Sequence, residues 1–139
     1  MFETIVALIL LVAEEVGVPP YFALAIALSE NPKLDPTAVN FNRNGTRDGG
    51  VFQTNSSWDN SDWTDIETNV RAGILHIKIL SENRLLNTWY GVAICYNAGT
   101  GWLREKKEPP ESSVKYAVKV YELYNKLTNK VETVIRGRT

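Results

Sequence analysis

The sequence predicts a mainly α-helical fold with one small β-hairpin or loop lobe. Apolar residues recur at helical spacing up to residue 30 and again after residue 65, whereas residues 31–65 are rich in Asn, Asp, Gly, Ser and Thr. A chain of 139 residues has the length of one domain and buries roughly two-thirds of its unfolded surface in one core. We therefore expect residues 1–139 to form a single domain.

The composition excludes several classes of protein. Hydrophobic residues at 44% and charged residues at 22% argue against disorder and fibrous folds. A net charge of -1 gives no attraction toward phosphate backbones, so nucleic acid is not an expected partner. Cys95, the single cysteine, excludes an intramolecular disulfide, and His76, the single histidine, leaves no zinc motif or histidine-based triad. We expect both to be structural, and no metal or other cofactor.

The N-terminal apolar run predicts a core helix rather than a membrane segment. Residues 5–13 are far shorter than the ~20 apolar residues that a membrane-spanning helix requires. Glu3 stands where a signal peptide has basic residues, and Glu14 and Glu15 stand where it has a small-residue cleavage site. If the protein is exported, we expect its signal to be absent from this sequence.

The first two helices have clear boundaries. The first is predicted over residues 4–16, because Gly17 suits a left-handed cap and the following prolines cannot continue the helix. Pro20 suits the first turn of a second helix, which runs to Glu30. Pro32 forces the residue before it out of the helical region and so ends the helix.

The polar stretch of residues 31–65 predicts a small β lobe. Short strands are expected at residues 38–41 and 50–54. Asn44-Gly45 and Asp48-Gly49 supply the residues that tight turns require.

Three further helices follow the lobe. A capping box of Thr64 and Glu67 opens the third, whose apolar residues continue to Leu80; Leu75 and Ile79 make it apolar on a second side, which predicts a central buried helix. The fourth covers residues 88–98 and ends at a left-handed Gly99.

The last helix is expected after a charged, proline-broken loop at residues 104–111. Ser112 or Ser113 caps it, and its apolar spacing continues to Leu127. The sequence after Thr128 gives no clear signal.

Two carboxyl groups in unlike surroundings suggest glycoside cleavage. Glu30 ends an apolar helix, where low dielectric and the negative end of the helix dipole both favour its protonated form, as a general acid requires. Asp48 lies in a glycine-rich polar stretch, where a carboxylate stays ionised. Such a pair can divide acid and nucleophile or stabiliser roles between its members. A solvated Glu30 and an Asp48 that only bonds its own turn are the alternatives.

Several polar and aromatic residues have two readings. Gln53 and Asn55, two apart on a predicted strand, would point to the same face, where they either line a cleft or bond the backbone of the lobe. Four tryptophans either stack on sugar rings or belong to the core: Trp58, Trp63, Trp89 and Trp102.

An ordered series of motifs carries a family resemblance. The motifs occupy residues 27–30, 42–55, 72–73, 93–99 and 116–120. The series resembles the soluble lytic transglycosylases of the lysozyme-like superfamily, and most closely the small specialised members that accompany type III and type IV secretion and conjugation systems. The resemblance covers about residues 4–127. It implies a mainly α, lysozyme-like (α+β) fold and cleavage of the β-1,4 bond between N-acetylmuramic acid and N-acetylglucosamine in peptidoglycan.

The resemblance also assigns roles to residues. The family's catalytic glutamate falls on Glu30, and its Gly-x-x-Gln motif ends at Gln53. Its Tyr-Asn-Ala-Gly motif begins at Tyr96 and Asn97, and the tyrosine of its last helix is Tyr116. These residues are candidate substrate contacts, with helix packing as the alternative.

The polar hairpin carries a second likeness and two departures from the family. Residues 44–58 also resemble the hairpin of animal-type lysozymes, in which the aspartate matching Asp48 is the second catalytic carboxylate. Asn31 stands where a serine usually follows the glutamate, and Thr54 stands where an aliphatic residue is usual.

Three functions remain open from the sequence. The first is a lytic transglycosylase in which Glu30 acts as acid and then as base to give 1,6-anhydro ends. The second is a hydrolytic lysozyme that uses Glu30 with Asp48, and the third is a non-catalytic peptidoglycan-binding protein. The resemblance implies glycan strands of peptidoglycan as partner, a periplasmic or secreted location, and association with a secretion, conjugation or phage machine.

Overall fold

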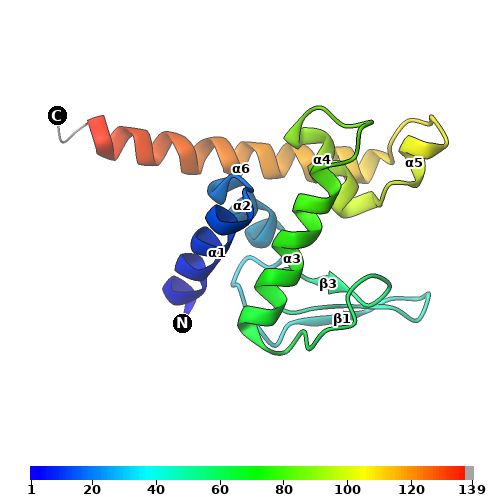
Figure 1. Cartoon of the computed structure of the whole chain (residues 1–139), viewed down its shortest axis with the longest axis horizontal. Coiled ribbons are helices and arrows are strands. Elements are labelled where there is room, and N and C mark those ends of the chain that lie inside the picture. The colour runs from blue at the N-terminus through cyan, green and yellow to red at the C-terminus, as the bar shows by residue number, and fades with distance from the viewer. Residues whose placement is uncertain (137–139) are drawn as a thin grey trace.

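A computed structural model describes the backbone of residues 1–136 and the side chains of residues 1–130. It confirms the predicted mainly helical fold with a small β lobe (Figure 1). The elements in chain order are α1 Phe2–Val16, α2 Pro20–Glu30, β1 Val39–Phe41, β2 Arg47–Gly49, β3 Thr54–Asn55, α3 Ile66–Ser81, α4 Trp89–Ala98, α5 Gly101–Arg104 and α6 Glu111–Arg136.

The lobe lies at one end of α3, and α4 and α6 lie at the other. In Figure 1, α6 crosses the top of the molecule, and α3 runs from the lobe up to α4. The three strands form an antiparallel sheet in the order β1-β2-β3, with Asp48 paired to Asn40 on one side and Asn55 on the other. In the part of the chain that the structure describes, no helix combines the length and the apolar character needed to cross a membrane.

The first two helices end as the sequence predicts. Gly17 adopts a left-handed conformation with φ 88° and its N–H donates to the Ala13 carbonyl. Pro20 occupies the first turn of α2, and the helix ends at Glu30. Glu30, at the end of α2, thus lies where its side chain lines a cavity together with residues of the lobe.

The predicted strand over residues 50–54 is wrong. Residues 50–53 form a tight turn between β2 and β3, in which Gly50 has φ 78° and Gln53 has φ 50°, and of the predicted range only Thr54 belongs to a strand. The Gln53 N–H donates to the Gly50 carbonyl at 3.1 Å, closing the turn. Val51 and Phe52 are both fully buried, so the alternation of inward and outward side chains that defines a half-buried strand is absent.

Two expectations for α3 are also wrong. Asp65, not Thr64, caps the helix: its carboxylate accepts from the Thr68 N–H at 3.0 Å, while Thr64 is bound by Asp62. Leu75 and Ile79 are exposed, so α3 is buried on one side only. The second apolar side of α3 therefore lies on the protein surface, and the helix is not central.

The later helices differ from expectation at their ends. Gly99 ends α4 with φ 77° but ψ -170°, which is not the left-handed helical conformation. Neither serine caps α6, because the helix begins at Glu111 and both serines lie inside its first turn. The Ser113 hydroxyl donates instead to Asn97. The helix also continues beyond Thr128 to Arg136, where the sequence pattern gave no signal.

A single buried cluster joins the helices to the turn of the lobe. Phe22 of α2 packs against the rings of Trp89, Tyr121 and Tyr124. Phe52, from the turn, lies against Gly73 of α3, where a Cβ would overlap its ring. Gly73 thus allows the close approach that places the lobe on α3.

A buried amide on α3 holds the backbone of the lobe. Asn69 is fully buried; its Oδ1 accepts from the Phe52 N–H at 2.9 Å, and its Nδ2 donates to the Gly49 carbonyl and the Thr54 hydroxyl, both at 3.0 Å. Buried backbone groups require such partners because water cannot reach them. Asn69 therefore fixes the position of residues 49–54 relative to α3.

We expect the substitution Asn69→Ala to lower the free energy of unfolding by about 2–3 kcal/mol, because it leaves the buried Phe52 N–H without an acceptor. Urea unfolding followed by circular dichroism measures the change. Asn60→Ala, at an exposed position outside the core, is the matched control and should change the free energy by less than about 0.5 kcal/mol. Equal effects of the two substitutions would contradict the role given to Asn69.

Candidate active site

A cavity of about 580 Å³ opens where the end of α2, the lobe, α3 and α4 meet. Six of the seven site residues expected from the sequence line it: Glu30, Asp48, Gln53, Asn55, Tyr96 and Asn97. The seventh, Tyr116 on α6, does not line the cavity, but its hydroxyl interacts with the Glu30 carboxyl. The tertiary structure thus brings together residues from the whole length of the predicted motif series.

The Glu30 carboxyl titrates near neutral pH. Burial raises its pKa from 4.5 to about 7; the Tyr116 hydroxyl opposes the rise, the charge of Asp48 adds to it, and the charge of Lys119 opposes it. The rise expected from the sequence is therefore present, with burial as its largest cause. A carboxyl group that is half protonated near neutral pH can donate a proton and later take one back.

Tyr116 supplies a polar group behind Glu30. Its hydroxyl is buried and has no hydrogen-bond partner of standard geometry among the residues that the structure describes. It nevertheless lies close enough to Glu30 to lower the pKa of the Glu30 carboxyl. Burial, and then the charge of Glu30, raise the pKa of Tyr116 well above its usual value. The phenol therefore stays protonated and can donate to Glu30 when that carboxyl ionises.

Asp48 lies on β2, held by two amides of the lobe. Its Oδ1 accepts from Asn55 Nδ2 at 2.8 Å, and its Oδ2 accepts from Asn42 Nδ2 at 3.1 Å. Hydrogen bonds of this kind stabilise a carboxylate and fix its orientation. Asp48 is thus a positioned negative group on the lobe wall of the cavity that also contains Glu30.

Gln53 lines the cavity but commits both of its amide hydrogens to the lobe. Its Nε2 donates to the carbonyls of Gly50 at 2.9 Å and Ala38 at 3.1 Å, and its Oε1 accepts from Asn40 Nδ2 at 2.9 Å. The side chain is 7% exposed. Both readings of the sequence therefore apply, since Gln53 borders the cavity and bonds the backbone of the lobe.

Asn55 is also committed to the lobe. Besides Asp48, its Nδ2 donates to the Thr46 hydroxyl at 3.2 Å, and its Oδ1 accepts from the Ser57 N–H. Gln53 and Asn55 do not share a strand face, because Gln53 belongs to the turn before β3.

The α4 residues retain groups that can face a ligand. The Tyr96 hydroxyl donates to the Phe52 carbonyl at 2.8 Å and keeps its acceptor capacity. Asn97 is exposed, and its Oδ1 accepts from the Ser113 hydroxyl at 2.7 Å. Its amide N–H groups have no partner among the described residues and are free to donate.

Sequence reasoning did not expect His76 or Ile79 in the cavity wall, and it left Trp58 open between sugar stacking and the core. The rings of Trp58 and His76 stack at 3.8 Å, and both line the cavity together with Ile79. Burial lowers the pKa of His76 to about 4, with the charge of Asp59 opposing the shift, so the ring is neutral at pH 7. The available signals were a tryptophan within a polar segment and apolar residues on an outer face of α3.

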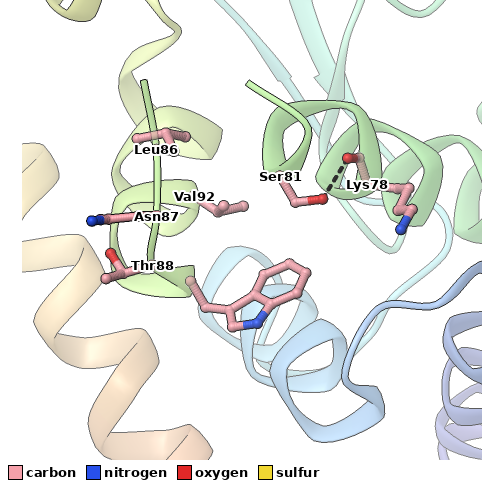
Figure 2. Close-up of a pocket in the computed structure, with 7 residues that line it drawn as sticks. Lys78, Ser81, Leu86, Asn87, Thr88 and Val92 are labelled. Atoms are coloured by element: carbon pink, nitrogen blue, oxygen red, sulfur yellow. Dashed lines mark hydrogen bonds between the residues drawn. The ribbon is translucent and has the colours of Figure 1, made fainter. Parts of the chain in front are cut away.

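A second pocket, of about 260 Å³, lies between the end of α3 and the start of α4 (Figure 2). The Ser81 hydroxyl donates to the Lys78 carbonyl there, and the Thr88 hydroxyl accepts from the Gly91 N–H. In Figure 2 the ammonium group of Lys78 points away from Thr88 and Val92. None of the predicted site residues lines this pocket.

The described residues contain no group of three or more His, Cys, Asp or Glu side chains placed to hold a metal ion. The cavity lining includes the Glu30 and Asp48 carboxyls together with hydroxyl, amide and aromatic groups.

Comparison with known proteins adds a family. A model described as "Transglycosylase SLT domain" matches residues 8–118. The matched segment contains all seven candidate site residues, from Glu30 to Tyr116. Comparison with curated proteins and with solved structures gives no match.

The raised pKa of Glu30 predicts a cost in stability at high pH. Below pH 4.5 the carboxyl is protonated whether the chain is folded or not; between 4.5 and about 7 it ionises in the unfolded chain only, so stability falls as pH rises. The full loss is about 3 kcal/mol. Glu30→Gln should remove it, so the variant should gain about that much relative to the natural chain between pH 4 and pH 8.

Denaturant unfolding at both pH values measures this difference, and other titrating groups cancel because the two proteins share them. Glu14→Gln, at an exposed position on α1, is the control and should leave the difference near zero. A Glu30→Gln variant that gains nothing at pH 8 would show that Glu30 titrates normally.

Proposed function

Because this chain belongs to the transglycosylase SLT domain family, we propose that it cleaves the β-1,4 bond between N-acetylmuramic acid and N-acetylglucosamine with Glu30 as its single acid and base. Members of the family are peptidoglycan lytic transglycosylases with a lysozyme-like fold, so the chain is an enzyme that acts on peptidoglycan in the cell envelope. The observation that carries the proposal is a carboxyl with a pKa of about 7 in a cavity large enough for sugar rings.

The first step is proton donation. Glu30 gives its proton to the glycosidic oxygen, the bond from that oxygen to the anomeric carbon of muramic acid breaks, and positive charge develops on the sugar. Glu30 is then a carboxylate, next to the Tyr116 hydroxyl, which can donate a hydrogen bond to it. The negative Asp48 on the lobe wall favours the positive sugar electrostatically.

The second step closes a ring without water. The Glu30 carboxylate takes the proton from the 6-hydroxyl of the same muramic acid, and that oxygen bonds to the anomeric carbon with assistance from the N-acetyl group. The product is a 1,6-anhydro end, and Glu30 regains the proton with which it began. This cycle needs one carboxyl that is stable in both protonation states, which a pKa near the working pH provides.

The substrate contacts follow from which groups are free. Asn97 can donate through its amide, and Tyr96 can accept through its hydroxyl. Trp58, stacked on His76, offers an apolar ring surface in the same cavity, a surface suited to a pyranose ring. Gln53 and Asn55 act chiefly by holding the lobe wall in place, since their amide hydrogens are already bonded.

From the sequence resemblance alone we also propose that the protein is periplasmic or secreted and that it is associated with a secretion, conjugation or phage machine.

We expect digestion of purified peptidoglycan to release fragments with 1,6-anhydro ends, because the 6-hydroxyl and not water completes the reaction. Mass spectrometry distinguishes these ends from reducing ends, which are heavier by one water. Glu30→Gln should release no fragments, since an amide can neither donate nor regain the proton. Reducing ends alone would contradict the transglycosylase mechanism and support a hydrolytic lysozyme.

Asp48→Asn tests whether a second carboxylate is required. A single-acid mechanism predicts that the variant still releases anhydro fragments and loses activity mainly above pH 6, because removing the Asp48 charge lowers the pKa of Glu30. The rate of fragment release as a function of pH measures this. Complete inactivity of a folded Asp48→Asn variant at every pH would assign Asp48 a direct role, as in the lysozyme alternative.

A further inference from the structure

Asn31 directly follows Glu30 and is fully engaged within the protein. It is 6% exposed. Its Nδ2 donates to the Asp35 carbonyl at 2.8 Å and to the Gly50 carbonyl at 3.2 Å, and its Oδ1 accepts from the Asp35 N–H at 3.1 Å. Both amide hydrogens are used, so none remains for a sugar.

One of these bonds crosses from the end of α2 to the lobe. Gly50 follows β2, the strand that carries Asp48, and its carbonyl also accepts from Gln53 Nε2 at 2.9 Å. The residue after Glu30 is therefore linked to the backbone two residues beyond Asp48. Loss of the link would leave the Gly50 carbonyl with its bonds from Gln53, but it would remove this bond between the end of α2 and the lobe and so loosen the contact.

We propose that Asn31 is a positioning residue that holds the lobe closed against the end of α2 and so keeps Asp48 facing Glu30. The inference rests on the proposed function, in which Glu30 is the acid.

The groups that face Glu30 show what opening the lobe would change. Tyr116 and Lys119 approach from α6, Tyr96 interacts from α4, and Asp48 faces it from β2. Of these, Asp48 alone lies on the lobe. Opening would admit water to Glu30 and withdraw the charge of Asp48, and both changes lower the pKa of Glu30, while the groups on α4 and α6 stay in place.

The test is the pH profile of Asn31→Ala. For the natural protein, kcat/KM with soluble glycan strands should fall as pH rises through about 7, where Glu30 loses its proton. In the variant this fall should move about one pH unit lower, which makes the rate at pH 7 about fivefold lower while the rate at pH 5 stays within about twofold. Asn31→Ser, with a shorter polar side chain, should act in the same direction and serves if the alanine variant fails to fold.

A direct measurement accompanies the rates. Carbon-13 NMR titration of the glutamate carboxyls gives the pKa of Glu30, whose resonance is identified by its absence in Glu30→Gln. A Glu30 pKa that stays near 7 in both Asn31 variants overturns the inference, and a lowered pKa supports it.

Val12→Ala controls for stability alone. Val12 is fully buried on α1, and the substitution should lower the melting temperature without moving either the pH profile or the Glu30 titration. An equal shift in Val12→Ala would reduce Asn31 to a general stabiliser and overturn the inference. The proposed function fails separately, through an active Glu30→Gln variant, whatever the Asn31 variants do.

Discussion

The structure depends on how three buried side-chain amides hold the backbone of residues 49–54. Asn31 at the end of α2 and Gln53 within the turn share the Gly50 carbonyl, and Asn69 on α3 binds the groups on either side of it. A turn with two left-handed residues and no regular ladder has few backbone partners of its own. The amides supply those partners, and they join the lobe to two helices at once.

That arrangement explains why a carboxyl can remain buried next to another one. Glu30 sits at the end of a rigid apolar helix, and Asp48 lies on a strand whose position is fixed through the same turn. Burial, with a smaller contribution from the charge of Asp48, raises the pKa of Glu30 to about 7, at a cost in stability at neutral pH. Such a cost is typical of active sites, where a group is held ready for a proton transfer.

The two walls of the cavity have different tasks. On the lobe, the Gln53 amide donates to the lobe backbone and the Asn55 amide donates to Asp48. These bonds make the lobe wall rigid and leave few groups of these two residues free to bind the glycan. Opposite, α3, α4 and the segment after β3 present Asn97, the Tyr96 oxygen and the Trp58–His76 stack. Recognition of the glycan is therefore expected from α3, α4 and the Trp58 ring, and positioning of charge from β2 and the turn after it.

The sequence by itself determined the helices around Glu30, the existence of the polar lobe and the order of the motifs, because caps, prolines and apolar spacing act over a few residues. Prediction from the sequence misplaced the strand over residues 50–54 and the cap of α3, and it wrongly expected α3 to be buried on both sides. It gave no reason to connect Asn69 with the lobe or His76 with Trp58. Those pairings join residues distant in the chain, and only packing in three dimensions, as of Phe52 on Gly73, decides which distant groups meet and which of them lose water.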